Sequence, residues 1–215
     1  MLQLTKAQSL FFVTDAFLIT EALTWFLSVY VMPMLWKVYP GLPVYTPTYL
    51  GAASMFFGSW FLYSMAKHTV RIKFDRTAFI TVAVGLVTTC VQVYVSHPLF
   101  SGSGRPNFAG WPVVSVFMSL FLSIVLSPIL EEVLVRGCYF EVLRRSWGDR
   151  SALKISTVLF VVPHLIWGGA LYLHPLSLLL LTLASVLYTY LYIVGGLVPA
   201  IAAHMLWNFY VACLS

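Results

Sequence analysis

Charged side chains are scarce in this sequence. They make up 9% of the 215 residues, and only seven of them are acidic, whereas 60% of the residues are hydrophobic. Soluble globular domains carry about a quarter charged residues and about half apolar ones, so this composition excludes an ordinary soluble domain. The mean hydropathy of +0.91 points the same way. Any charge that lies inside an apolar segment therefore needs a specific explanation.

Cysteine is also rare. Cys90, Cys138 and Cys213 lie in three separate apolar segments, and no CxxC spacing occurs. An odd number without ligand spacing supports neither a disulfide framework nor a cysteine zinc cluster, and the HExxH pair of zinc proteases is missing as well. The simplest interpretation is that the three cysteines pack in the apolar interior as small hydrophobic residues. Cys138 follows Glu131 by seven residues on the same helical face, which leaves a thiol nucleophile as an alternative.

The sequence shows no internal repeat, low-complexity tract or soluble domain, and we expect no cleaved signal sequence. The first apolar run is long, contains Asp15 and Glu21, and lacks a small-residue cleavage site behind a short core. The six-residue spacing of these two acids puts them on different helix faces, which suits a role in holding helices together. The first apolar run is therefore expected to remain as a span.

Apolar runs of about 20 residues, long enough to cross a hydrocarbon core of about 30 Å as helices, fill the chain. They predict an all-α transmembrane bundle of seven spans over residues 9–36, 46–66, 78–100, 111–130, 153–173, 176–194 and 197–214. We expect one integral membrane domain over 1–215, with N-terminal spans in 1–110 and the polar motifs in 111–214. The lipid bilayer is an expected partner. Nucleic acid is not, because the basic residues cluster at span ends.

The lysines and arginines predict an orientation. Ten of the twelve fall on one side if the N-terminus is cytoplasmic, and only Lys37 and Arg105 fall on the other. An excess of basic residues marks the cytoplasmic side. The predicted topology is N-in and C-out, with cytoplasmic basic loops at 67–76 and 144–154.

Polar side chains at a similar depth below the inner surface come from three predicted spans. An ionisable group at the bilayer centre costs at least about 2.5–3.5 kcal/mol and is by default a functional hypothesis. Each residue alone could be a hydrogen-bonded packing residue, but one acid, two imidazoles and one amide at matched depth favour chemistry. The members are Glu131 near the inner end of the fourth span, His164 in the fifth, and His204 and Asn208 one turn apart in the last.

Three motifs within these spans resemble those of the CPBP family, which comprises type II CAAX prenyl endopeptidases and bacterial Abi-type proteins. They are Glu-Glu-x-x-x-Arg at 131–136, Phe-x-x-x-His at 160–164 and His-x-x-x-Asn at 204–208. Their order and spacing match, and the resemblance covers about 111–214. It implies an intramembrane glutamic endopeptidase that needs no metal and no other cofactor.

The resemblance also implies a role for each residue. Glu131 corresponds to the catalytic glutamate, and His164 assists it in activating a water. His204 and Asn208 match the residues that bind the oxyanion, while Glu132 and Arg136 match a supporting ion pair. The chemistry agrees, because amide hydrolysis needs a base, a nucleophile and oxyanion donors. An i,i+4 ion pair also neutralises one of two adjacent buried anions.

The same polar residues allow other interpretations of the function. Glu131, His164 and His204 could form a two-histidine, one-carboxylate zinc site. The residues could also line a binding cavity in a non-proteolytic immunity factor, a partner-binding regulator or a transporter, although a transporter would be expected to show a repeat. The resemblance permits a prenylated CAAX tail, a bacteriocin-type leader or a C-terminal sorting tail as substrate. We expect a prokaryotic cytoplasmic membrane, and the sequence indicates no oligomeric state.

Overall fold

The computed structural model describes residues 4–38, 70–100, 113–167 and 174–213. Within these ranges the chain is all-helical and contains no strand, which confirms the predicted all-α class. The elements labelled η are π-helices. In chain order the helices are α1 (Lys6–Phe26), η1 (Leu27–Val31), α2 (Met32–Val38), α4 (Arg76–Phe100), α5 (Val113–Phe121), η2 (Leu122–Leu126), α6 (Ser127–Glu132), η3 (Val133–Phe140), α7 (Glu141–Trp167), α9 (Pro175–Gly195) and α10 (Leu197–Cys213).

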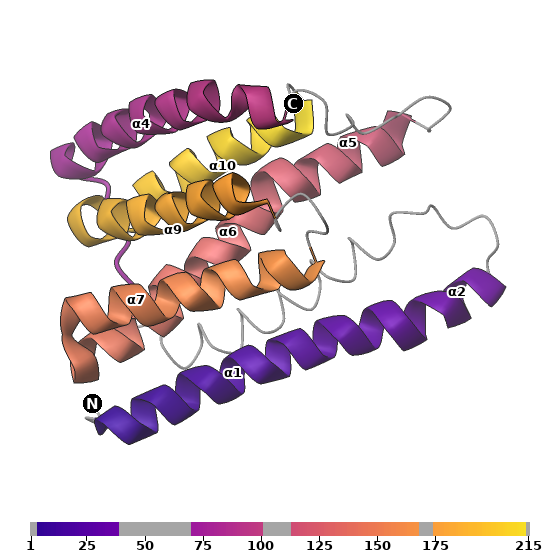
Figure 1. The fold of residues 1–215 in the computed structure, drawn as a ribbon, viewed down its shortest axis with the longest axis horizontal. Helices are drawn as coiled ribbons and strands as arrows, with labels where there is room; N and C mark the ends of the chain where they lie inside the picture. The colour runs from indigo at the N-terminus through magenta and orange to yellow at the C-terminus, as the bar shows by residue number, and fades with distance from the viewer. Residues whose placement is uncertain (1–3, 39–69, 101–112, 168–173, 214–215) are drawn as a thin grey trace.

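The helices pack as neighbouring rods in a bundle (Figure 1). α4, α9 and α10 contact one another, α7 packs against α9 and η3, and α1 covers α7 from the far side. The main core lies where these helices meet η3. Its fully buried side chains include Cys138, Phe140, Leu143 and Tyr192. This arrangement brings η3, α7, α9 and α10 together around one interior.

Three stretches of the described residues are long and apolar enough to cross a membrane, namely Arg76–His97, Val116–Ile166 and Pro175–Gly195, and Leu197–Ala212 is a shorter apolar helix. Together these four stretches overlap five of the predicted spans, because Val116–Ile166 includes residues 116–130 of the fourth span and 153–166 of the fifth. The predicted span at 9–36 is helical, but it is not one of the three stretches that are long and apolar enough to cross a membrane. The span at 46–66 lies outside the described residues. The count of seven therefore remains a prediction.

The chain reverses direction at Gly148, and this corrects the loop predicted at 144–154. Helix α7 runs through that segment, apart from a kink at Gly148 with φ 76° and ψ 168°. A positive φ of this size is readily adopted by glycine, so one residue is enough to turn the chain back. In Figure 1 the two arms of α7 form a hairpin at this point. The reversal returns the chain along η3 and brings His164 back to the depth of α6.

A second glycine turn joins α9 to α10. Gly196 has φ 81°, and a Cβ there would lie 2.8 Å from the backbone oxygen of Arg71. That oxygen accepts a hydrogen bond from the backbone N–H of Leu197 at 2.8 Å. The turn is therefore held by the segment that precedes α4.

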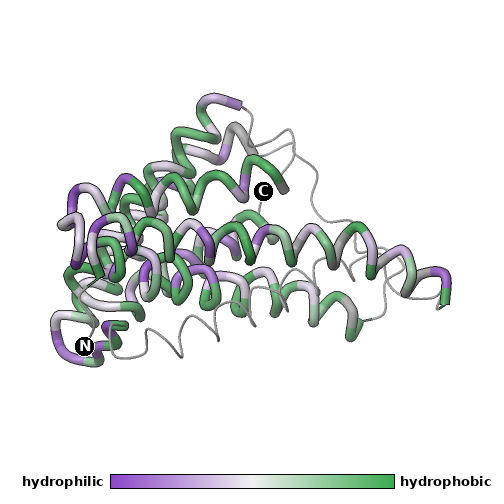
Figure 2. The backbone as a smooth tube through the Cα atoms, turned by 90° about the horizontal axis from the view of Figure 1, so that it is seen from below, coloured by the Kyte–Doolittle hydropathy of each residue, from purple (hydrophilic) through white to green (hydrophobic). Residues whose placement is uncertain are grey.

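The polar ends of several helices lie together. The start of α1, the Gly148 reversal, the start of α4 and the α9–α10 turn all lie at one end of the bundle in Figure 1. In Figure 2 hydrophobic residues run along most of the helix length, and hydrophilic stretches gather near that same end. Large apolar side chains of α4 are exposed, among them Phe79, Val87 and Tyr94. An exposed apolar face of this kind suits a lipid environment.

Candidate active site

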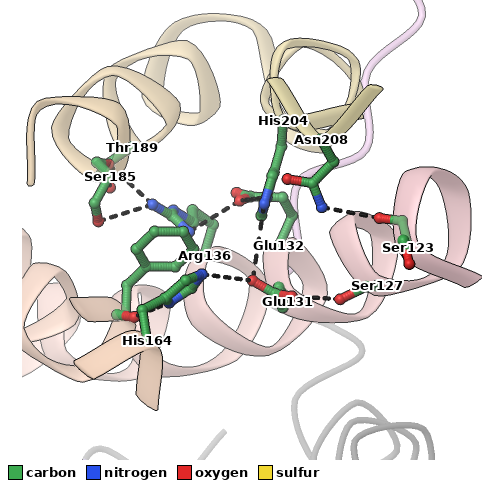
Figure 3. Close-up of polar contacts among 11 residues, drawn as sticks. Ser123, Ser127, Glu131, Glu132, Arg136, His164, Ser185, Thr189, His204 and Asn208 are labelled. Atoms are coloured by element: carbon green, nitrogen blue, oxygen red, sulfur yellow. Dashed lines mark hydrogen bonds and ion pairs between the residues drawn. The ribbon is translucent and has the colours of Figure 1, made fainter. Parts of the chain in front are cut away.

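The polar motif residues converge inside the bundle, between α6, η3, α7 and α10 (Figure 3). The Gly148 reversal and the Gly196 turn bring these helices back past one another. Motif residues that are 33 to 73 positions apart in the sequence thereby come close to one another, and Asn208 lies beside them. They are Glu131 and Glu132 on α6, Arg136 on η3, His164 on α7, and His204 and Asn208 on α10.

Glu131 faces both histidines. Its Oε2 lies 3.9 Å from Nε2 of His164 and 3.8 Å from Nε2 of His204. Its other oxygen, Oε1, accepts a hydrogen bond from the hydroxyl of Ser127, one helical turn earlier. Oε2 is buried and has no hydrogen-bond partner. The carboxylate is thus held by one oxygen, and the other is directed at two imidazole nitrogens.

Hydrogen bonds at the far side of each ring orient the imidazoles. Nδ1 of His164 lies 2.8 Å from the backbone oxygen of Phe160, and Nδ1 of His204 lies 2.8 Å from Oε1 of Glu132. Both partners only accept, so Nδ1 carries the proton in each ring. In the neutral state both Nε2 atoms then present a lone pair towards Glu131.

Glu132 and Arg136 form a buried ion pair. Arg136 Nη1 lies 2.9 Å from Glu132 Oε1, and both side chains are fully buried. The second terminal nitrogen of Arg136 donates at 2.9 Å to both the backbone oxygen and the hydroxyl of Ser185 on α9. A buried ion pair is stable only when its remaining polar atoms are satisfied. Ser185 and His204 supply part of that satisfaction from two other helices.

Aromatic rings enclose the same cluster. The guanidinium carbon of Arg136 lies 4.6 Å from the ring centre of Phe160 and 5.5 Å from that of Tyr188. Tyr188 in turn stacks on His204, with ring centres 4.9 Å apart and an interplanar angle of 18°. A cation over a desolvated aromatic face gains about 2 kcal/mol. The rings therefore fix both the arginine and the imidazole while excluding water.

Asn208 is anchored to a backbone atom. Its Nδ2 donates to the carbonyl oxygen of Ser123 in η2 at 2.9 Å. Figure 3 shows this amide beside His204, on the side of the cluster that faces η2. The structure therefore places Asn208 next to the histidine with which it shares a helix face.

Several residues of the cluster were not identified from the sequence. Ser127 lies four residues before Glu131, and the i,i+4 rule could have found it. Ser185 and Tyr188 gave no such signal, because they reach Arg136 and His204 only through the packing of α9. The sequence therefore identified the motif residues that meet in the cluster and missed several residues that contact them.

The two other mechanistic alternatives have different outcomes. Cys138 is fully buried in the apolar core with Val13 and Phe140, so its thiol has no route to a substrate. Among the described residues, no group of three or more histidines, cysteines or acids has an arrangement suited to a metal ion. We therefore take the thiol mechanism no further, whereas the zinc alternative is tested by metal analysis.

Residues 113–210 match the family model described as type II CAAX prenyl endopeptidase Rce1-like. The matched region contains all three motifs and confirms the resemblance drawn from them. No curated protein and no solved structure matches the chain.

Proposed function

Because residues 113–210 belong to the type II CAAX prenyl endopeptidase Rce1-like family, we propose that this integral membrane protein is an intramembrane glutamic endopeptidase. It would hydrolyse a peptide bond in a membrane-attached protein or peptide. The proposal rests on the surroundings of Glu131. Its Oε2 has no hydrogen-bond partner and faces Nε2 of His164 and Nε2 of His204.

Glu131 and His164 are suited to activating a water. Their facing atoms are too far apart for a direct hydrogen bond, but a water between them can donate one hydrogen to each. In the proposed reaction the water oxygen bonds to the peptide carbonyl carbon while Glu131 takes its proton. The C–N bond then breaks as that proton reaches the departing amine, directly or by way of His164. General acid–base transfer of this kind contributes about 10²–10⁴ to the rate.

His204 and Asn208 are suited to holding the oxyanion. Since Nδ1 of His204 is bound to Glu132, its Nε2 can donate only when the ring carries both protons. The same hydrogen bond holds the ring so that its Nε2 lies 3.8 Å from Glu131 Oε2, next to the reacting atoms of the proposed mechanism. Glu132 therefore supports His204 as well as pairing with Arg136.

Exposure indicates where a substrate approaches. The side chains of His164 and Glu131 are 23% and 15% exposed, whereas those of His204 and Glu132 are 3% and 0% exposed. The scissile bond would reach the cluster from the α6–α7 side and meet the water-activating pair first. We further propose a single membrane domain over 1–215 with seven spans, N-in and C-out, in a prokaryotic cytoplasmic membrane. The catalytic half of the chain is 111–214, and its catalytic residues lie buried in the cytoplasmic half of the membrane.

The test compares three strains that differ only in this protein. One carries the wild type, one lacks the protein, and one carries Glu131→Gln at equal membrane abundance. Quantification of peptides from membrane proteins should show the same uncleaved precursors in the deletion and in Glu131→Gln. If Glu131→Gln restores the wild-type pattern, the protein acts without this carboxylate, as an immunity factor or a partner-binding regulator would.

A further inference from the structure

Pro128 lies where the segment that carries the glutamates changes from a π-helix to an α-helix. The backbone N–H of Ser127 donates to the carbonyl of Leu122, five residues earlier, as in a π-turn. If this i→i−5 pattern continued by one residue, the carbonyl of Ser123 would accept a hydrogen bond from the backbone N–H of residue 128. Proline has no N–H. Neither residue 127 nor residue 128 therefore supplies a donor to Ser123.

Asn208 supplies that donor from another helix. Its Nδ2 lies 2.9 Å from the Ser123 oxygen, across 85 positions of sequence. Because a carbonyl oxygen only accepts, the contact fixes which end of the amide faces η2. One hydrogen of the nitrogen is used in this bond, and the second remains available on the same atom.

We propose that Pro128 is a positioning residue for Asn208, a role that rests on the proposed peptidase function. By removing the helix's own donor, Pro128 keeps the Ser123 carbonyl available to Asn208. The anchored amide then directs its second N–H at the oxyanion rather than rotating to other acceptors. Directly before the same proline, the Ser127 hydroxyl holds Glu131. Two serines that precede Pro128 thus hold the acid and the amide in one relative position.

Pro128→Ala tests the role, because alanine returns a backbone N–H at this position. Alanine is also the better helix former, so the variant is expected to melt at or above the wild-type temperature. The probe is a quenched fluorescent peptide with a farnesylated C-terminal tail, added to the full-length protein in liposomes. We expect kcat to fall about tenfold with KM unchanged, less than the roughly 100-fold loss typical of removing one oxyanion donor. Pro175→Ala, at the first turn of α9 and outside the cluster, is the matched control.

A double-mutant cycle separates this role from a general shift of α6. If Pro128 acts through Asn208, then Pro128→Ala should change kcat little in an Asn208→Ala background. An equal loss in both backgrounds would mean that the proline acts through Glu131 instead. A wild-type kcat for Pro128→Ala would also overturn the proposal.

Hydrogen exchange of the Asn208 side-chain amide is a second measurement, and it does not depend on peptidase activity. The chain has two asparagines, Asn107 and Asn208, so ¹⁵N-asparagine labelling of an Asn107→Gln background leaves one side-chain amide. The Asn208 amide should exchange slowly with solvent, and Pro128→Ala should speed that exchange at least severalfold. Unchanged exchange contradicts the positioning role. If the exchange responds while wild-type protein never cleaves the probe, the positioning stands and the peptidase proposal fails for this substrate.

Discussion

Nδ1 of His204 lies 2.8 Å from Oε1 of Glu132, a carboxylate with no solvent exposure. The same oxygen accepts from Arg136 at 2.9 Å. Glu132 is therefore held by groups from η3 and α10, and its loss would leave the Arg136 guanidinium without its counter-charge and Nδ1 of His204 without its acceptor. Glu131 differs, because its Oε2 faces the Nε2 atoms of His164 and His204, at 3.9 Å and 3.8 Å. The two adjacent glutamates thus have different surroundings, which supports the proposal of one structural and one catalytic role.

Glu132→Gln should destabilise the protein by about 3–5 kcal/mol, the usual result of breaking one side of a buried ion pair. Arg136→Gln should cost a similar amount, and the double variant should recover part of the loss because neither charge is then left alone. Thermal unfolding in detergent micelles would measure this. Asp149→Asn, at an exposed acid, is the control and should stay within about 0.5 kcal/mol. A Glu132→Gln variant as stable as that control would contradict the account.

Ser127→Ala should lower kcat about tenfold without unfolding the protein. The hydroxyl orients Glu131 through Oε1, and a hydrogen bond to a charged group is worth about 1.5–3 kcal/mol. Ser127→Thr keeps the hydroxyl and should retain most of the activity. Ser156→Ala, at a buried serine bonded to the Leu153 carbonyl, is a matched control outside the cluster. Equal losses in the Ser127→Ala and Ser127→Thr variants would argue that packing, not the hydrogen bond, matters here.

The acid–base account predicts activity without a metal. Wild-type protein should cleave at its normal rate in a strong chelator and should contain less than one zinc per chain. Elemental analysis of the active preparation and rates before and after chelation would decide this. Stoichiometric zinc, with activity lost on removal and restored on return, would make Glu131, His164 and His204 ligands instead.

The topology can be tested by cysteine labelling in a background without the native cysteines. Lys73→Cys should react only with a membrane-permeant reagent if the N-terminus is cytoplasmic, and Arg105→Cys should react with an impermeant reagent from outside. Lys73 lies in the segment that is bonded to the α9–α10 turn, so its label also places that end of the bundle. Outside labelling at position 73 would reverse the predicted orientation.

The sequence predicted that polar residues from three helices meet at one depth, because helical spacing and depth are local properties. The all-α class follows from the apolar runs, and the spacing of His204 and Asn208 puts both on one face of α10. The turn at Gly195–Gly196 was equally readable, since two glycines interrupt an apolar run. These predictions needed no knowledge of which helix packs on which.

The supporting contacts could not be predicted because they depend on tertiary packing. Nothing near Arg136 in the sequence points to Ser185, which is 49 positions away. The bond between His204 and Glu132 likewise depends on how α10 rotates against α6. The π-turn beside Pro128 is likewise a property of the folded backbone, in which a continuous helical segment accommodates the proline. The predicted loop at 144–154 was wrong because a single glycine reverses the chain.

The central claim is that Glu131 carries the chemistry, and Glu131→Gln tests it most directly. Glutamine keeps the size of the side chain and can still accept from Ser127, but it cannot take a proton from water. We predict no cleavage of the farnesylated reporter above background, with membrane abundance and melting temperature close to wild type. Wild-type cleavage by Glu131→Gln would contradict the account, and if Glu132→Gln were then stable and inactive, the roles of the two glutamates would be reversed.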